Sequence, residues 1–235
     1  MTKYHPDTRF LTDYSAGSLP ESQALCVAAH LHYCPACRTK VSELTHVGSE
    51  IFLSQEGEYV SEDCFDIIMA KLADLPTTAR QASSLTSASD LNTAATPTKK
   101  ATESSKEKHA NDLPRAIQKI TGGNIEKMRW RKIGKSFRYS DINMGDEKRE
   151  TSLLHIKAGG NVPKHHHRGD EITVILKGSF SDQEDHYNVG DYIVRTSGEM
   201  HTPVASQDED CLCLATLDAP IVMNNWFYRI LAPLF

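Results

Sequence analysis

The sequence predicts a multi-domain α + β protein, in which a small zinc-binding helical domain is followed by an antiparallel β-barrel of the jelly-roll type. Apolar residues recur at helical spacing in the first 75 positions and at a period of two after residue 112. The segment between them is rich in Ser, Thr and Ala and has no aromatic residue, so it cannot bury enough surface to offset its ordering entropy. We therefore divide the chain into a helical domain at 1–75, a flexible linker at 76–112 and a β-domain at 113–235.

Composition and charge exclude several classes of protein. The chain has 235 residues, including six cysteines, and a net charge of -5. It has no run of about 18 apolar residues, and its N-terminus resembles neither a signal peptide nor a transit peptide. We therefore expect no contact with the membrane and a cytoplasmic location, where cysteines stay reduced and can bind metal. Acidic residues outnumber basic ones in the helical domain, which disfavours direct nucleic-acid binding and allows docking to a basic protein surface.

The helical domain is expected to contain several short helices. Chain breaks are predicted at Ala16-Gly17 and at Cys34-Pro35. A helix start is predicted at Ser18-Leu19-Pro20-Glu21, with Ser18 as the N-cap. Two later segments carry one apolar stripe each: Val41, Leu44, Val47 and Ile51 in the first, and Phe65, Ile68, Met69 and Leu72 in the second, where Ser61 is the expected cap and Glu62-Asp63 lie in the first turn.

These apolar stripes have two possible roles. About 70 residues support only a marginal hydrophobic core, which a bound zinc ion would reinforce. A stripe that the core does not need would be free to contact the helices of a partner protein. The stripe from Phe65 to Leu72 is expected to serve one of these two purposes.

The β-domain is expected to consist of short antiparallel strands. The candidate strands are bounded by turn residues such as Gly178 and Asn188-Val189-Gly190. They are Thr151 to Ile156, Glu171 to Lys177, Asp191 to Arg195 and Cys211 to Leu217. Short strands with turn signals about every ten residues are typical of a barrel or jelly roll.

A first metal-ligand pattern lies in the helical domain. His30 and Cys34 are four residues apart, so on a helix they share one face. The segment Cys34-Pro35-Ala36-Cys37 then turns the chain and presents two sulfurs to one point. A structural zinc ion takes four ligands, and His5 near the chain start is the best candidate for the fourth.

This first pattern leaves two alternatives open. His32 or His46 would compete with His5 for the fourth position. The two cysteines would alternatively form a redox dithiol, although that interpretation gives His30 no role. The pattern His-x3-Cys-x2-Cys with an upstream histidine resembles the zinc-binding anti-sigma fold, over residues 1 to about 75. Domains of that fold occlude an extracytoplasmic-function (ECF) sigma factor and keep it off RNA polymerase.

A second metal-ligand pattern lies in the β-domain and contains no sulfur. Gly159-x5-His165-x-His167-x3-Glu171-x6-Gly178 resembles the first cupin motif at every spacing. On one extended strand His165, His167 and Glu171 have the same parity, so all three can point into the barrel.

His201 would complete the second pattern from a facing strand. It follows a segment that resembles the second cupin motif but departs from it, because Thr196 stands where proline is usual and Ala205 where asparagine is. These departures affect the turn and the surroundings of the site rather than the number of ligands. Three histidines and one carboxylate suit an exchangeable or reactive divalent metal; zinc is the first expectation, and manganese, iron or nickel also fit.

A zinc-binding anti-sigma domain joined through a linker to a cupin resembles the ChrR family of anti-sigma factors. The resemblance implies that the first domain binds and inhibits a group IV (ECF) sigma factor and that the cupin responds to singlet oxygen or organic peroxide. It also implies two metal sites, with the ligands His5, His30, Cys34 and Cys37 in the first domain and His165, His167, Glu171 and His201 in the cupin. The protein is then a negative regulator of transcription and not an enzyme.

The remaining cysteines and the overall function have alternative interpretations. Cys211 and Cys213 would face the same side of a strand and are either a sensing pair or small buried residues, and Cys26 and Cys64 are expected in the core. The main alternative function is a metal-dependent cupin dioxygenase or isomerase with a regulatory zinc domain. Its only candidate acids or bases near the metal are Asp170 and Glu199. A zinc-dependent DNA-binding repressor is disfavoured, because the first domain is acidic and has no basic recognition helix.

Overall fold

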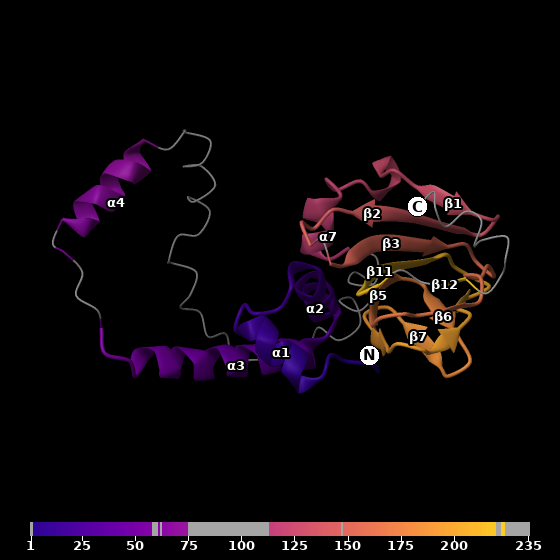
Figure 1. The fold of residues 1–235 in the computed structure, drawn as a ribbon, viewed down its shortest axis with the longest axis horizontal. Coiled ribbons are helices and arrows are strands. Elements are labelled where there is room, and N and C mark those ends of the chain that lie inside the picture. Colours follow the sequence, from indigo (N-terminus) through magenta and orange to yellow (C-terminus); the bar gives the residue numbers. More distant parts are fainter. Residues whose placement is uncertain are drawn as a thin grey trace, which may run out of the picture. The chain divides into compact units, whose positions relative to one another are not determined.

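Figure 1 shows the fold in a computed structural model, which describes residues 2–57, 61, 63–74, 113–146, 148–219 and 222–223. The linker expected at 76–112 lies outside the described residues. Met1–Glu50 and Glu103–Phe235 form one compact unit, and α4 belongs to a second unit that is described by itself. The domain boundaries at residues 75 and 112 stay predictions.

The N-terminal part of the chain is helical, as the sequence predicts. Asp7 begins the first helix, because its side chain accepts a hydrogen bond from Phe10 N at 2.9 Å. The chain breaks at Ala16-Gly17 and Cys34-Pro35 are confirmed. The helices are α1 (Thr8–Ser15), α2 (Glu21–Tyr33), α3 (Pro35–Leu53), α4 (Cys64–Ala73), α7 (Arg115–Ile120) and the 3-10 turn η2 (Ile125–Lys127).

The helix cap expected at Ser18 is wrong. α2 begins at Glu21, and Pro20 occupies the N-cap position without a side-chain hydrogen bond. Ser18 Oγ donates instead to the carbonyl oxygen of Asp13 at 3.1 Å. Ser18 therefore binds the C-terminal end of α1 and does not cap the N-terminus of α2. The capping pattern in the sequence is compatible with both roles.

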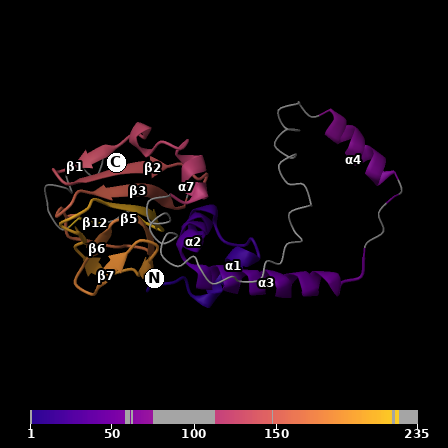
Figure 2. The ribbon, with the colours of Figure 1, turned by 180° about the vertical axis from the view of Figure 1, so that it is seen from behind.

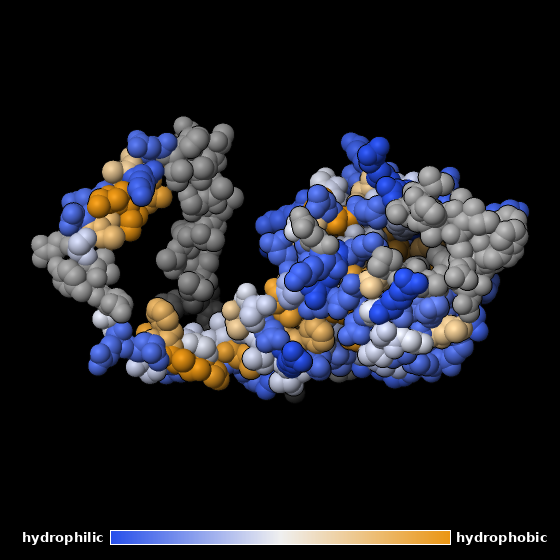
Figure 3. Space-filling model, in the orientation of Figure 1, coloured by the Kyte–Doolittle hydropathy of each residue, from blue (hydrophilic) through white to orange (hydrophobic). Residues whose placement is uncertain are grey.

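The helix α4 presents its apolar residues to solvent. It begins at Cys64, directly after Asp63, so Ser61 lies too far upstream to cap it as expected. Cys64 is only half-buried, which corrects its expected place in a core. Figure 3 shows apolar side chains gathered along this helix, and the exposed ones are Phe65, Ile67, Ile68, Met69 and Leu72.

The β-domain is an assembly of antiparallel strands, which confirms the predicted fold class. One sheet has the order β1-β2-β3-β11-β5-β8, a second β10-β6-β7 and a third β12-β4-β9. The four strands expected from the sequence are all present. The bounds are β1 (Arg131–Ile133), β2 (Phe137–Ile142), β3 (Glu150–Ile156), β4 (His165–His166), β5 (Glu171–Lys177), β6 (Ser179–Ser181), β7 (His186–Asn188), β8 (Tyr192–Arg195), β9 (Met200–His201), β10 (Val204–Ala205), β11 (Cys211–Leu217) and β12 (Val222–Met223).

The central strands β11 and β5 of the six-stranded sheet are buried on both faces, and β5 shows why. Val174 and Leu176 share a hydrophobic cluster with residues of α1, α2 and α7, whereas Ile175 between them joins a cluster inside the barrel with Phe137 and Tyr187. A strand that is covered on both sides has an apolar run in place of a clear alternation. This accounts for the unbroken burial from Ile172 to Leu176, in which Thr173 is the one polar residue.

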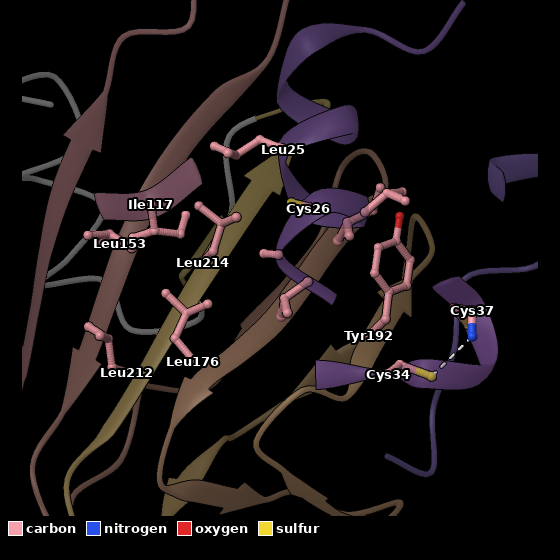
Figure 4. Packing of buried hydrophobic residues seen from close by; sticks show 14 of the residues in the cluster. Leu25, Cys26, Cys34, Cys37, Ile117, Leu153, Leu176, Tyr192, Leu212 and Leu214 are labelled. Carbon is pink, nitrogen blue, oxygen red and sulfur yellow. Dashed lines mark hydrogen bonds between the residues drawn. The ribbon is translucent and has the colours of Figure 1, made fainter. Parts of the chain in front are cut away.

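The helix α2 covers the outer face of this sheet. It contacts β5, β8, β11 and α7. Figure 4 shows Leu25 and Cys26 of α2 beside Leu176, Tyr192 and Leu214 of the strands. Seen from behind in Figure 2, α2 again lies against the strands. The helices α1, α2 and α7 therefore share one hydrophobic core with the sheet. The expected burial of Cys26 is confirmed.

Hydrogen bonds attach the N-terminal residues Lys3 and Tyr4 to the same sheet. Asp191 Oδ1 accepts hydrogen bonds from the backbone nitrogens of Lys3 at 2.6 Å and Tyr4 at 3.1 Å. The carbonyl oxygen of Tyr4 accepts in turn from Tyr192 N at 3.0 Å. These bonds hold the segment that leads into His5 against β8.

No helix in the described part of the chain is both long and apolar enough to cross a membrane.

Two candidate metal centres

The first centre gathers the four residues that the sequence pattern selects. His5 precedes α1, His30 lies in the last turn of α2, Cys34 ends that helix and Cys37 lies in the first turn of α3. His5 Nδ1 lies 3.4 Å from Cys34 Sγ and 3.5 Å from Cys37 Sγ. A tetrahedral zinc ion with the usual bond lengths separates a nitrogen and a sulfur ligand by about 3.6 Å. The spacing of these atoms therefore fits a zinc ion between them.

The barrel fixes the orientation of His30. His30 Nδ1 donates to the carbonyl oxygen of Gly190 at 2.6 Å, so the lone pair of the ring lies on Nε2. That Nε2 atom is buried and has no hydrogen-bond partner. A metal ligand whose other nitrogen donates to a carbonyl is the usual arrangement at histidine metal sites. The β-domain thus supplies the outer contact for a candidate ligand of the helical part.

Gly190 itself has to be a glycine. Its φ is +88°, in the left-handed region that side chains disfavour. A Cβ atom there would lie 2.6 Å from Cβ of Tyr33 and 2.6 Å from Cγ2 of Thr2. The absence of a side chain lets Gly190 lie against Thr2 and Tyr33, with its carbonyl within reach of His30.

The protonation states at the first centre also favour a bound cation. Burial lowers the pKa of His30 to about 4, so the ring is neutral and its lone pair is available at pH 7. Burial, followed by the contact with Cys34, raises the pKa of Cys37 to about 12. A thiolate at Cys37 would therefore need a positive charge beside it.

The competing histidines lie elsewhere. His32 packs its ring on that of Tyr33, with the centroids 4.7 Å apart. His46 is exposed and lies 3.6 Å from Glu50 on the same helix. Neither belongs to the group of converging ligand atoms in the described part of the chain.

The second centre gathers His165, His167, Glu171 and His201 inside the barrel. His201 Nε2 lies 2.9 Å from His165 Nε2 and 3.1 Å from His167 Nε2. Glu171 Oε2 lies 3.1 Å from His167 Nε2 and has no hydrogen-bond partner. Neighbouring ligands around one metal ion are separated by about 3.0 to 3.4 Å at ordinary metal–nitrogen distances.

The route by which these four residues meet differs from the expected one. His165 lies in β4, His167 in the turn that follows, and Glu171 begins the separate strand β5, so the three do not share one strand. His201 lies in β9, which pairs with β4 at the register His165↔His201, so it comes from a neighbouring strand and not a facing one. The parity argument selected residues that the structure brings together, although the chain turns between them.

Hydrogen bonds set the tautomers at the second centre. His165 Nδ1 donates to the carbonyl oxygen of Pro163 at 2.9 Å, and His201 Nδ1 faces Asp182 Oδ2 at 3.3 Å. Both rings therefore carry their lone pair on Nε2, and these two atoms face each other. Two lone pairs at 2.9 Å repel each other unless a cation or a proton lies between them.

Burial shifts the pKa values at the second centre toward neutral side chains. Burial lowers the pKa of His165 to about 4 and that of His167 to about 3, which keeps both rings neutral. Burial raises the pKa of Glu171 to about 7, against the lowering effect of the hydrogen bond from Thr173 Oγ1 at 3.0 Å. A divalent ion would reverse that rise by stabilising the carboxylate.

The sequence did not reveal the outer contacts of this centre. Asp182 is buried and binds Arg195 Nη2 at 2.6 Å as well as facing His201. Burial alone would raise the pKa of Asp182, but backbone N–H groups and Arg195 lower it below its usual value, so the carboxylate is charged. Asp182 lies in a polar turn far from the cupin spacings, and no local pattern marks it. Of the two acids considered earlier, Asp170 is exposed and Glu199 accepts from Thr196 Oγ1 at 2.7 Å.

Cys211 and Cys213 face the barrel interior. Their sulfurs lie 3.5 Å apart, and both side chains are buried in the cluster that contains Ile175. The contact with Cys211 and burial raise the pKa of Cys213. Same-side placement is confirmed, whereas a sensing role stays a prediction.

Both groups of residues are thus compatible with metal binding. Their chemistry differs, because sulfur and imidazole suit a closed structural zinc site, while imidazole and carboxylate suit an exchangeable ion.

Comparison with known proteins adds independent support. The family model described as "ChrR Cupin-like domain" matches residues 119–219. The anti-sigma-E factor ChrR of Cereibacter sphaeroides is 31% identical over 99% of this chain and 98% of its own length. The crystal structure of Rhodobacter sphaeroides SigE in complex with the anti-sigma ChrR matches with a TM-score of 0.70 and 29% identity, covering 92% of this chain and 99% of that chain. Because the similarity extends over nearly the whole sequence and includes both halves, this chain belongs to the ChrR family of anti-sigma factors.

Proposed function

We propose that this chain binds and inhibits an ECF sigma factor and releases it when the cupin senses singlet oxygen or an organic peroxide. The observation that carries the first half is the similarity to the anti-sigma-E factor ChrR, which spans 99% of the chain. The chain is then a negative regulator of transcription rather than an enzyme. It acts in the cytoplasm, where its thiols stay reduced and can hold metal.

The proposed cofactors are a structural zinc ion and a second divalent ion. His5, His30, Cys34 and Cys37 hold the first, and their mixed sulfur and nitrogen donors support zinc. The barrel group holds the second ion, for which zinc also fits the donor set. When bound, this second ion supplies a charged centre whose ligands an oxidant can modify.

The sigma factor is proposed to contact exposed apolar helix faces. On α4 the exposed residues Phe65 and Met69 are one helical turn apart, and Leu72 extends the same stripe. Phe52 on α3 is also exposed. An amphipathic helix that leaves its apolar face uncovered is suited to dock on helices of a partner.

A charge placed on α4 is expected to weaken sigma-factor binding without unfolding the protein. Ile68 is 52% exposed, so Ile68→Asp adds no buried charge and should leave the thermal midpoint within about 2 °C of the wild type. Binding measured by surface plasmon resonance should fall at least about tenfold, because an interface would have to desolvate the carboxylate. Lys71→Ala on the same helix is the matched control. Wild-type binding by Ile68→Asp would remove α4 from the interface.

The two centres are joined by a continuous set of contacts. His201 faces Asp182, and Asp182 binds Arg195 Nη2 at 2.6 Å. The same guanidinium donates to Tyr187 Oη at 2.6 Å. The ring of Tyr187 packs on that of Tyr4 with centroids 5.0 Å apart.

Tyr4 then leads directly to the first centre. Its hydroxyl donates to Asp185, its backbone is paired with β8, and the next residue is His5. We infer that loss or oxidation of the barrel ligands displaces Asp182 and Arg195 and so loosens the chain start that carries His5. A coupling free energy of about 3 kcal/mol along this route changes affinity by roughly a hundredfold.

The variant Tyr187→Phe tests this route. It removes the hydroxyl that accepts from Arg195 but keeps the ring against Tyr4, so folding, metal content and inhibition should be retained. The response of a sigma-dependent reporter to oxidant should fall several-fold. The control is Tyr139→Phe. In the wild type the Tyr139 hydroxyl accepts a hydrogen bond from Arg131 Nη1 at 3.5 Å, and neither residue belongs to the route. A full response in Tyr187→Phe would show that the signal does not pass through this contact.

A further inference from the structure

A cavity on the barrel lies apart from both centres. Its volume is about 350 Å³, and it opens beside the hairpin formed by β1 and β2. Its polar lining residues include Lys132, Lys135, Arg138, His155, Lys157 and Asp210. None of these belongs to either group of candidate metal ligands.

The strand register concentrates positive charge at this cavity. Lys132 of β1 is directly opposite Arg138 of β2, and Arg138 is directly opposite His155 of β3. The Lys132–Arg138 pair places like charges at opposed positions, which destabilises a sheet, whereas burial lowers the pKa of His155 and so favours its neutral form. Lys135 in the hairpin turn and Lys157 after β3 add two further cations. The arrangement costs stability unless an anion offsets it.

The nearby acids do not neutralise these lysines. Asp210 Oδ1 accepts from Ala158 N at 2.8 Å, and Asp210 Oδ2 lies 3.1 Å from His155 Nε2, so both oxygens are engaged. Within the described ranges, Lys132, Lys135 and Lys157 are in no ion pair. Arg138 Nη2 lies 3.5 Å from Glu126 Oε2, so this arginine is paired and the three lysines carry the excess charge. The cavity is therefore positive, although the whole chain has a net charge of -5.

The cavity is also held in shape. Lys157 N donates to the carbonyl oxygen of Ser136 at 2.8 Å, which ties the end of β3 to the hairpin turn. The guanidinium of Arg138 lies over the ring of Trp130, 4.4 Å from its centroid. Stacking on Trp130 and the contact of Nη2 with both carboxylate oxygens of Glu126 at 3.5 Å fix this guanidinium in place. Less side-chain entropy is then lost when a ligand binds.

From these features we infer that the cavity binds a small molecule through a phosphate monoester group. Cations from three separate segments can each reach a different oxygen of a dianionic phosphate, whereas a single carboxylate offers only two. A volume of about 350 Å³ is at the lower end of the range for ligand pockets, which fits a compact metabolite. The concave shape and the burial of Phe137 favour such a ligand over nucleic acid, which would need a long basic track or exposed aromatic rings for stacking.

Calorimetric titration of the full-length, metal-loaded protein tests this inference. The probes are inorganic phosphate, glucose 6-phosphate and adenosine 5′-monophosphate, with glucose and adenosine as uncharged controls and a short DNA duplex as a polyanion. We expect saturable binding of at least one phosphate monoester and none of the uncharged controls. Tighter binding of inorganic phosphate would identify the free ion as the ligand, and preference for the duplex would overturn the small-molecule assignment.

Matched variants locate the binding. Lys132→Gln combined with Lys135→Gln removes two exposed cations and should lower affinity at least about tenfold, with a weaker dependence on salt. Lys119→Gln on α7, also exposed, should bind like the wild type. Equal affinity in the double variant, or no saturable binding of any phosphate compound, would overturn the site. No measurement here involves a sigma factor, so the outcome is independent of the proposed function.

Discussion

Replacing Cys34 by serine is expected to remove zinc from the first centre and to detach the N-terminal helices from the barrel. Cys34 ends α2, and its sulfur is one of the atoms that converge with His5 and Cys37. A structural zinc ion contributes about 10 to 16 kcal/mol, which is comparable to or larger than the whole stability of an ordinary domain. Serine is a poor ligand for zinc at neutral pH. The helices should therefore lose their fixed packing when the ion is lost.

The consequence extends beyond the helices. Tyr192 and Leu214 of the sheet are covered by α2, so their exposure should make the variant aggregate. Elemental analysis should find one zinc ion fewer per chain, circular dichroism should show a loss of helix, and sigma-factor binding should disappear. Cys64→Ser changes a half-buried cysteine outside the group and should keep both ions. Full zinc content and full binding in Cys34→Ser would disprove the zinc assignment.

Replacing His167 by alanine is expected to leave inhibition intact and to abolish the response to oxidant. Its side chain is 1% exposed and lies 3.1 Å from both Glu171 Oε2 and His201 Nε2. Removing one of four converging ligands should lower metal affinity by orders of magnitude. The first centre uses none of these atoms, so sigma-factor binding should remain.

The matched control for this variant is its neighbour. His166 is half-buried in β4 and lies outside the ligand group, so His166→Ala should retain metal and response. The measurement is a sigma-dependent reporter with singlet oxygen or organic peroxide added, together with the metal content of the purified proteins. Equal induction in wild type and His167→Ala would reject the sensor role. Turnover of a small substrate by the purified wild type would favour a dioxygenase instead.

The two groups of converging side chains were predictable from sequence because metal sites constrain residue type and spacing closely. The pattern of His30, Cys34 and Cys37 selected a group that the structure brings together, and the cupin spacing did the same for His165 and Glu171. Strands such as β5 were predictable for a similar reason, since an apolar β-branched run between turn residues has few other uses.

The contacts between distant segments were not predictable. Asp182 and Gly190 act on candidate ligands through contacts that span 19 and 160 residues, and neither has a local pattern. The attachment of α2 to the sheet was also missed. Its apolar residues were consistent with a core inside a small helical domain, and periodicity does not say which surface a helix face will cover.

The hydrophobic core that α1, α2 and α7 share with the six-stranded sheet limits which parts of this protein can be exchanged with those of other proteins. A chimera that joins these helices to a foreign cupin would lose the Gly190 carbonyl that holds His30 and the strand side chains that share a hydrophobic cluster with Val27. The reverse graft would leave the outer face of β5 without its cover. Transplanting the sensor to another regulator therefore requires moving α2 and the facing strand surfaces as one piece, and natural exchange between relatives meets the same constraint.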